Sequence, residues 1–212
     1  NATAGAKVAH GLSQAPDWLW IKGRSIGTGH VIYHHKNTAA PETDYLAFHT
    51  SDATYDAQFL NDTAPDAKCF TIGGNGQATN NNTETYVAYC WHEVPGFSRF
   101  GTYRGNGNAD GPFIYTGFKP AWVMYKQTNT TNYWAIFDLT RSKTNVMQHR
   151  LAPNYNYVEN VGTANQQDFL SNGIKLRGTD TTTNQSGGTY VYMAFAEHPF
   201  NGNGEGAFAT AR

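Results

Sequence analysis

A repeat at a constant distance of 104 residues constrains the fold of this chain more than any other feature of its sequence. One pair of repeated blocks is Pro-Asp-Trp-Leu-Trp-Ile-Lys at residues 16–22 and Pro-Ala-Trp-Val-Met-Tyr-Lys at residues 120–126. Three further pairs keep the same distance: His30–Tyr33 with Trp134–Phe137, Phe70–Ile72 with Ile174–Leu176, and Thr85–Pro95 with Thr189–Pro199. Because four pairs share one register over about 80 residues, the sequence predicts a tandem duplication.

The composition of the chain predicts an all-β fold. The 212 residues include 25 Thr, 22 Gly, 20 Asn and 13 Tyr, but only 8 Leu. Helix-forming residues are therefore scarce, whereas β-branched, aromatic and turn-forming residues are abundant. Aromatic residues make up 14% of the chain, which is enough to build hydrophobic cores.

Short strands separated by turns are expected in both halves of the chain. In the first half the predicted strands are Ala6–His10, Asp17–Lys22, His30–His34, Tyr45–His49, Cys69–Ile72 and Thr85–His92. In the second half they are Phe100–Arg104, Pro112–Tyr115, Ala121–Lys126, Trp134–Asp138, Phe169–Leu176 and Thr189–Glu197. Without helical periodicity, this spacing favours two β-sandwich or jelly-roll units, residues 1–96 and 97–212.

The near-neutral charge argues against two classes of partner. Lys and Arg number 15 and Asp and Glu number 16, so the net charge is −1. Binding to nucleic acid or to an anionic membrane depends on positive charge, and no apolar run approaches the roughly 20 residues of a spanning helix. We therefore expect a soluble globular chain without a nucleic-acid or membrane partner. Because it begins with Asn1, we expect a fragment or a processed product.

The two cysteines, Cys69 and Cys90, allow one disulfide at most. They fall on successive predicted strands, so a disulfide is geometrically allowed without being implied. We favour small buried thiols in a protein that is assembled in the cytosol.

Catalytic groups are not predicted. Glu93 and Glu197 occupy equivalent positions at the ends of the Thr-Tyr-Val strands. A glycosidase needs two carboxyl groups about 5 to 10 Å apart around one sugar, and a single carboxylate in each repeat does not supply them. We expect both glutamates to accept backbone hydrogen bonds. The chain also has no Gly-X-Ser-X-Gly nucleophile motif.

Four histidines in the first half are the main candidates for a metal site: His30, His34, His35 and His49. Zinc requires three or four ligands that converge on one point. On a strand, however, His35 points away from the face that His30 and His34 share. We therefore expect structural or surface histidines rather than a metal centre.

Two glycine-rich loops are candidates for ion binding. Asn106, Asn108 and Asp110 offer oxygen ligands to calcium, although turn formation explains the same residues. The loop at residues 73–76 follows a strand but opens no helix, so it does not form a phosphate-binding turn. The sequence therefore predicts neither a metal nor a cofactor.

Several long phrases resemble a repeat family of marine-phage tail-fibre and virion proteins. These phrases are Tyr86–Ser98, Tyr103–Phe113, Asp168–Gly173, Gly188–Glu197 and Ala209–Arg212. The resemblance covers almost the whole chain and implies a lectin-like β-sandwich, similar to concanavalin-A-like or SPRY-like domains. It carries over no catalytic residues. In the first half the partner of the Phe100–Arg104 strand is absent before Asn1, which implies a longer parent chain.

On this resemblance, we expect a non-enzymatic structural protein of the virion, of the tail-fibre type, that is assembled in the host cytoplasm. Its expected partners are other virion proteins, copies of itself (as a trimer, by resemblance) and a glycan or protein on the host surface. Two alternatives stay open. One is a purely structural capsid decoration or connector protein, and the other is a cellular carbohydrate-binding module.

Recognition is expected where the two halves differ and where loops are held on a rigid scaffold. The predicted ligand-binding residues are Trp20, Arg24, His34, His35, Tyr103 and Arg104. They combine aromatic faces with hydrogen-bond donors, a combination suited to sugar rings and hydroxyl groups. The alternative interpretation is that Trp20 belongs to the core and that the histidines are merely solvated.

Overall fold

The computed structural model describes residues 2–74, 76 and 78–199. The chain divides into two compact units, Asn1–His92 (unit 1) and Glu93–Arg212 (unit 2), whereas the sequence placed the boundary after residue 96. Residues 93–97 belong to unit 2 because Val94 pairs with Ser98 in a tight turn, and the carbonyl group of Phe97 accepts a hydrogen bond from Ala196.

The fold is all-β, as the composition predicted. Every strand pair in the described residues is antiparallel. Helix is limited there to one α-helical turn and two 3-10 turns. None of these helices has the length and apolar character needed to cross a lipid bilayer.

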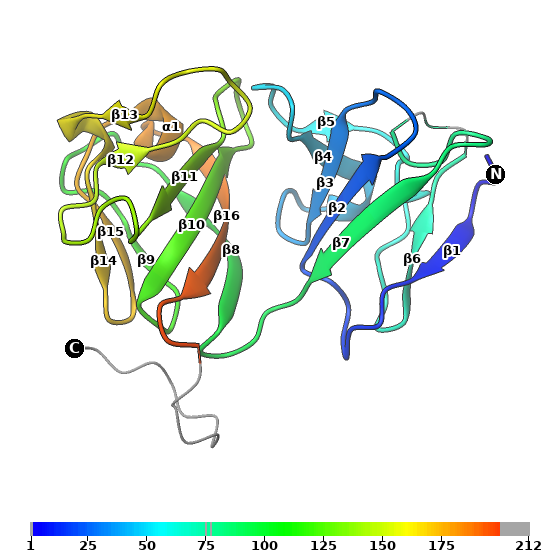
Figure 1. Cartoon of the computed structure of the whole chain (residues 1–212), viewed down its shortest axis with the longest axis horizontal. Helices are drawn as coiled ribbons and strands as arrows, with labels where there is room; N and C mark the ends of the chain where they lie inside the picture. The colour runs from blue at the N-terminus through cyan, green and yellow to red at the C-terminus, as the bar shows by residue number, and fades with distance from the viewer. Residues whose placement is uncertain (1, 75, 77, 200–212) are drawn as a thin grey trace. The chain divides into compact units, whose positions relative to one another are not determined.

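Unit 1 consists of two sheets around one core (Figure 1). Its elements are β1 (Ala6–Ala9), β2 (Trp18–Gly23), β3 (His30–His34), η1 (Pro41–Thr43), β4 (Asp44–Ala47), β5 (Tyr55–Asp56), β6 (Cys69–Ile72) and β7 (Tyr86–Trp91). The larger sheet has the order β5-β4-β3-β2-β7, and β1 pairs with β6 in the smaller sheet. Leu19, Ile21 and Tyr33 of the larger sheet pack with Phe70 of the smaller one, in a sandwich-like arrangement.

Unit 2 consists of three sheets, and its main sheet has four strands. Its elements are β8 (Ser98–Arg104), β9 (Phe113–Tyr115), β10 (Pro120–Gln127), β11 (Ala135–Asp138), β12 (His149–Arg150), β13 (Asn160–Val161), η2 (Thr163–Asn165), β14 (Gln167–Leu170), β15 (Gly173–Leu176), α1 (Thr181–Asn184) and β16 (Thr189–Ala196). The sheets have the orders β11-β10-β16-β8, β14-β15-β9 and β12-β13. Val123, Tyr125 and Tyr192 pack with Phe169 and Ile174 in the core between the first two sheets.

The strand register of unit 1 recurs in unit 2. Trp18 lies opposite His34 on one side and Trp91 on the other, and 104 residues later Trp122 lies opposite Asp138 and Phe195. In the smaller sheets Val8 lies opposite Phe70, and Ile114 lies opposite Ile174. This second pairing places β9 two residues later than a constant distance of 104 requires.

A buried asparagine joins two loops in each unit. The amide nitrogen of Asn80 donates to the carbonyl oxygens of Thr3 and Gly73, at 2.9 and 2.7 Å. Asn184 lies 104 residues later and donates to two carbonyl oxygens at 2.8 and 2.9 Å, those of Asn108 and Gly178. In both units the asparagine therefore ties the segment before the first strand of the smaller sheet to the segment after its partner.

One strand prediction is wrong. Residues 169–176 form two strands, β14 and β15, which pair with each other and turn at Ser171 and Asn172. Asn-Gly is a strong hairpin signal, so this turn was readable in the sequence. The short elements β5, β12, β13 and α1 were not predicted, because two to four residues are too few to show a hydrophobic period.

The core of unit 2 can be tested at Phe137, which is fully buried among Met147, Phe169 and Tyr125. We expect Phe137→Ala to lower the free energy of unfolding by about 3–5 kcal/mol, because it removes apolar contacts and leaves a cavity. The matched control is Phe113→Ala on β9, where the ring is 45% exposed, with an expected loss of about 1 kcal/mol or less. Urea denaturation measures both, and equal losses would contradict the described core.

Candidate functional site

The structure places four of the six predicted site residues in unit 1 and two in unit 2. In unit 1, His34 is fully buried: its ring lies edge-on to Trp18, with centroids 5.5 Å apart, and its Nδ1 accepts the backbone N–H of Lys36 at 3.0 Å. His35 stacks on His34 at 5.0 Å and pairs with the carboxylate of Asp17 at 2.8 Å. The two histidines are therefore close together, but only His35 has surface to offer a ligand.

Trp20 lies on β2 and Arg24 directly after it, and neither forms a common site with the histidine pair. The indole N–H of Trp20 donates to Nδ1 of His30 at 3.1 Å, and its ring packs against Phe48 at 4.3 Å. Burial, followed by the charges of Lys22 and His49, lowers the pKa of His30, which suits its role as an acceptor. Arg24 follows β2 and is exposed.

Tyr103 of unit 2 is a packing residue. Its hydroxyl group donates to the carbonyl oxygen of Thr183 at 2.7 Å, and its ring stacks on Tyr190 with centroids 4.8 Å apart. Burial raises the pKa of Tyr103 well above its ordinary value of 10.0, and the nearby tyrosines, first Tyr125, raise it further. Arg104, the next residue, is exposed.

The carboxylates of Glu93 and Glu197, which we expected to accept backbone hydrogen bonds, form ion pairs in the structure. Glu93 forms an ion pair with Arg99, and Glu197 forms one with Lys119 at 2.8 Å. Each carboxylate therefore faces a basic side chain, not a second carboxylate in an acid–base pair.

The glycine-rich loop after β8 uses its oxygens internally. The side-chain oxygen of Asn106 accepts the backbone N–H of Asn108, whose own side-chain oxygen accepts the N–H of Asp110. The Asp110 carboxylate pairs with Lys175 at 2.6 Å. Within the described ranges, no three His, Cys, Asp or Glu side chains converge as a metal site requires.

Both cysteines, which we expected to be small buried thiols, are free thiols and are partly buried. Burial raises the pKa of Cys90 to about 11, so this thiol is unreactive at neutral pH.

A cluster of tyrosines in unit 2 was missed by the sequence analysis. The rings of Tyr133, Tyr155 and Tyr157, called here the tyrosine cluster, lie with centroids 4.2 to 5.3 Å apart. Tyr155 and Tyr157 are 49% and 52% exposed. The hydroxyl groups of Tyr133 and Tyr157 are 3.2 Å apart, and this hydrogen bond raises the pKa of Tyr157. The cluster therefore offers preformed aromatic surface to solvent.

A hollow of about 380 Å³ adjoins the tyrosine cluster. It is lined by Arg150, Ala152, Tyr157, Val158, Glu159, Asn160 and Val161. The carboxylate of Glu159 pairs with Arg141 at 2.9 Å and with His149 at 3.4 Å. The hydrogen bond from Arg141, together with that from His149, lowers the pKa of Glu159. The hollow therefore combines one aromatic wall with fixed polar groups.

Arg150 connects this hollow to the core of unit 2. Its guanidinium group donates to the carboxylate of Asp180 at 2.9 Å and to the hydroxyl group of Thr182 at 2.6 Å. Asp180 also caps α1 by accepting the N–H of Thr182. Figure 1 shows α1 beside β12 and β13, so the ion pair attaches the loop that bears the tyrosines to a regular element.

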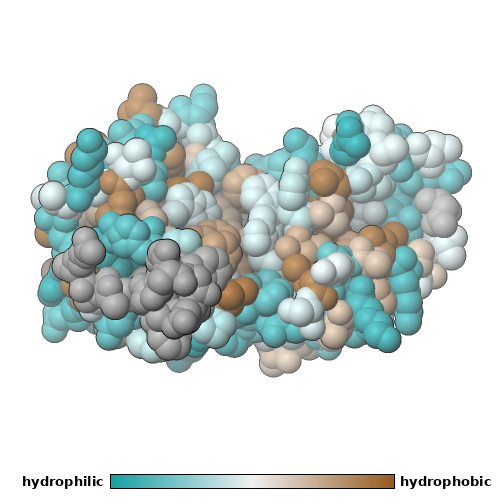
Figure 2. Space-filling model, turned by 60° about the horizontal axis from the view of Figure 1, so that its bottom comes forward, coloured by the Kyte–Doolittle hydropathy of each residue, from teal (hydrophilic) through white to brown (hydrophobic). Residues whose placement is uncertain are grey.

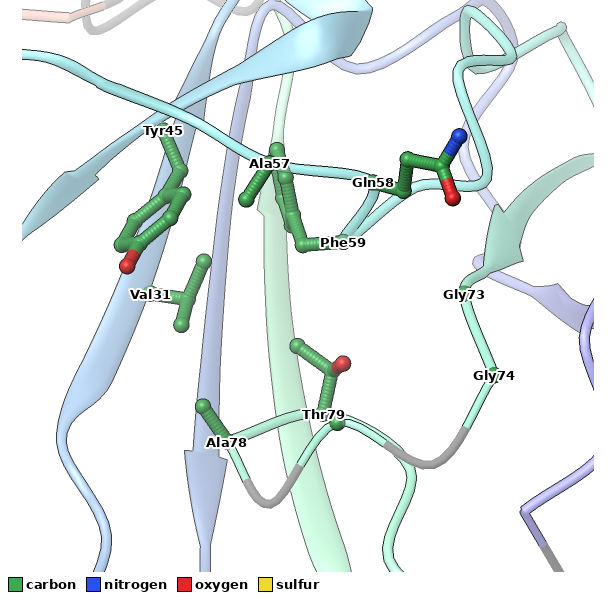
Figure 3. A pocket seen from close by; sticks show the side chains of 10 residues that line it. Val31, Tyr45, Ala57, Gln58, Phe59, Gly73, Gly74, Ala78 and Thr79 are labelled. Atoms are coloured by element: carbon green, nitrogen blue, oxygen red, sulfur yellow. The ribbon is translucent and has the colours of Figure 1, made fainter.

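A second hollow, of about 270 Å³, lies in unit 1 (Figure 3). Val31 and Tyr45 come from the larger sheet, Ala57 and Phe59 from the segment after β5, and Thr79 from the loop before β7. Its walls are mainly apolar, and Tyr45 stacks on Tyr55 beside it at 5.0 Å. It offers fewer charged groups than the hollow in unit 2.

The signal for the tyrosine cluster is present in the sequence at Tyr155-Asn156-Tyr157. These residues lie between β12 and β13, outside any strand that the repeat predicts. A comparison of repeated blocks does not find them, because the equivalent residues at a distance of 104 are Ser51 and Ala53, which are not aromatic. The sequence evidence for an exposed aromatic site was two tyrosines separated by one asparagine in a loop.

The geometry defines a class of protein with antiparallel all-β units and an exposed aromatic surface on loops. The chain belongs to the family described as "Domain of unknown function (DUF7483)", whose model matches residues 1–199. Searches of the curated proteins and of the solved structures found no match.

Substitutions distinguish the predicted site residues that pack in the core from those that are exposed, because only the former change the free energy of unfolding strongly. We expect Tyr103→Ala to lower the free energy of unfolding by about 3–5 kcal/mol, because it removes a packed ring and its hydrogen bond. The neighbouring substitution Arg104→Ala should change it by no more than about 0.5 kcal/mol, since the side chain is exposed. Chemical denaturation compares the two, and a stable Tyr103→Ala protein would contradict the packing role.

The pKa of Glu159 tests the polar wall of the hollow. It lies below the ordinary value of 4.5, so the ion pair is intact above that value and is lost as the pH falls through the lowered pKa. We expect Arg141→Gln to raise the pKa of Glu159 towards 4.5, as measured by NMR titration of its carboxyl carbon. The control Arg177→Gln removes the partner of Asp168 and should leave this titration unchanged.

Proposed function

We propose that this chain is a non-enzymatic structural protein of a bacteriophage particle, of the tail-fibre type, that binds a glycan on the host surface. The resemblance of its long phrases to virion repeat proteins supports the place in the particle. The exposed tyrosine cluster supports glycan binding, and it is the observation that carries the proposal.

The chemistry of the tyrosine cluster suits a sugar. Tyr155 and Tyr157 present half-exposed ring faces, on which the C–H face of a pyranose ring can pack. Arg150, Glu159 and Asn160 line the adjoining hollow with donors and acceptors for hydroxyl groups. Because Arg150 and Glu159 are already paired, a neutral sugar can bind beside them without leaving a charge unpaired.

We also infer that the two units are tandem copies of one lectin-like β-sandwich. The equal strand register and the equivalent asparagines Asn80 and Asn184 support this origin. In this proposal the duplicated scaffold holds loops that have diverged. The segment between β11 and β14 of unit 2 carries the recognition surface.

A glycan array tests the proposed recognition. The probe is an immobilised set of neutral hexose oligosaccharides, and the analyte is the full chain with a fluorescent label. We expect saturable binding that falls by about tenfold, or about 1.4 kcal/mol, in Tyr155→Ala and in Tyr157→Ala, because each removes a stacking face. The matched control is Tyr115→Ala, a tyrosine on β9 that is 58% exposed.

Two results would overturn the proposal. One is binding that Tyr155→Ala and Tyr157→Ala leave intact. The other is the absence of any binding on the array while the purified chain is folded. For the predicted partners and trimeric assembly, mass spectrometry of purified particles and light scattering of the chain provide separate tests. Absence of the chain from the particles would exclude the virion role.

A further inference from the structure

Strand β7 leaves one side of the larger sheet of unit 1 open. Its only hydrogen-bonded neighbour in the described residues is β2. The equivalent strand of unit 2, β16, lies between β10 and β8. The difference appears in burial: Val191 and Met193 of β16 are buried, whereas Tyr89 of β7 is 50% exposed. An open strand edge offers a row of backbone groups to a further strand.

A groove follows this open edge. It has a volume of about 370 Å³ and lies between β7 and the smaller sheet, with Ile21, Phe70, Tyr86 and Ala88 among its walls. In unit 2 the ring of Tyr103 on β8 packs against Tyr125, Tyr190 and Tyr192. Those three residues are equivalent to Ile21, Tyr86 and Ala88. The groove is therefore the place that β8 and its tyrosine occupy in the other unit.

The chain carries a second sequence that resembles β8. Residues 206–212, which lie outside the described residues, read Gly-Ala-Phe-Ala-Thr-Ala-Arg. Strand β8, residues 98–104, reads Ser-Arg-Phe-Gly-Thr-Tyr-Arg. The phenylalanine, the small residue after it, the threonine and the final arginine recur at the same spacing.

The side chains of residues 206–212 match those of β7 in size. A Cβ atom on Gly101 would lie 2.7 Å from the hydroxyl oxygen of Tyr192, so β8 requires glycine there. The register of β8 on β16, transferred to β7, places Ala209 opposite Ala88, where a methyl group has room. The same register places Phe208 opposite Tyr89, an aromatic cross-strand pair.

The charge of Arg212 is complementary to that of Glu84 beside the end of β7. Arg104 lies opposite Thr189, so the transferred register places Arg212 opposite Thr85. The residue before Thr85 is Glu84, which lines the groove and has no acidic counterpart in unit 2, where Gly188 stands. An arginine at this position would therefore meet a carboxylate that only unit 1 supplies.

We propose that the open edge of β7 binds residues 206–212 of a second copy of this chain as an added antiparallel strand. The strand hydrogen-bonds to the backbone of residues 85–91 and covers the groove, as β8 does in unit 2. This contact joins unlike surfaces, so it links copies head to tail. It adds a mode of self-assembly to the proposed function and does not depend on glycan binding.

The test uses the full chain, three variants and one control substitution. We expect light scattering to show self-association that increases with concentration, and hydrogen exchange to show protection of the amides of β7. Deletion of residues 206–212 should abolish both. Ala88→Tyr recreates the crowding of Tyr192 and should abolish association, while Ala209→Gly in the same chain should restore it. The control Ala39→Tyr changes an exposed loop residue and should have no effect.

Two further substitutions should change the strength of self-association in opposite directions. Glu84→Gln should weaken association by roughly two- to five-fold, as expected for one exposed ion pair. Ala211→Tyr supplies the ring that Tyr103 supplies in β8, and it should strengthen association because it fills the groove.

Three results would overturn the proposal: a monomer at high concentration with unprotected β7 amides, association that survives the deletion, or protected β7 amides in a concentration-independent monomer. The last result would mean that the strand is donated within one chain. None of these outcomes depends on the glycan array, so failure of this contact and failure of recognition are distinguishable.

Discussion

The buried asparagine of each unit is the interaction on which the rest of that unit depends. Asn80 joins the carbonyl groups of Thr3 and Gly73, which lie just beyond the paired ends of β1 and β6. A Cβ atom on Gly73 would lie 1.9 Å from the carbonyl oxygen of Gln58, so only glycine brings its carbonyl group to the asparagine. A buried amide without these acceptors would cost about 1–3 kcal/mol for each lost partner.

The same constraint determines where the interior tyrosines lie. The hydroxyl group of Tyr86 accepts the N–H of Asn81, and that of Tyr190 accepts the N–H of Gln185. In each unit the tyrosine hydroxyl group therefore bonds to the backbone of the residue that follows the buried asparagine. Burial raises the pKa of Tyr190 to about 12, so the phenol stays neutral and keeps its hydrogen bonds at any physiological pH. Tyrosine is needed here because phenylalanine would leave that N–H without its acceptor.

Much of the fold was readable in the sequence because repetition and alternation are properties of regular structure. The repeated Trp18 and Trp122 identify equivalent strands, and the structure gives them equivalent partners. The site was less readable. Trp20, His34 and Tyr103 are the residue types that bind sugars, but the same types fill cores, and only packing distinguishes the two uses. The exposed Tyr155 and Tyr157 lie in a loop without hydrophobic periodicity, and their equivalents Ser51 and Ala53 do not repeat the pattern.

The two units thus share an arrangement of paired strands, but β8 of unit 2 has no counterpart among the described residues of unit 1. In unit 2, β8 supplies Tyr103 to the core, and Gly101 gives Tyr192 the space to lie flat beneath that strand. In unit 1, Ala88 replaces that large ring, and Glu84 introduces a charge at the edge. These changes act together, because a smaller residue on β7 admits a larger residue on the strand beside it. An edge that merely faced water would need no such match in size and charge, so the differences in unit 1 suit a strand of another sequence.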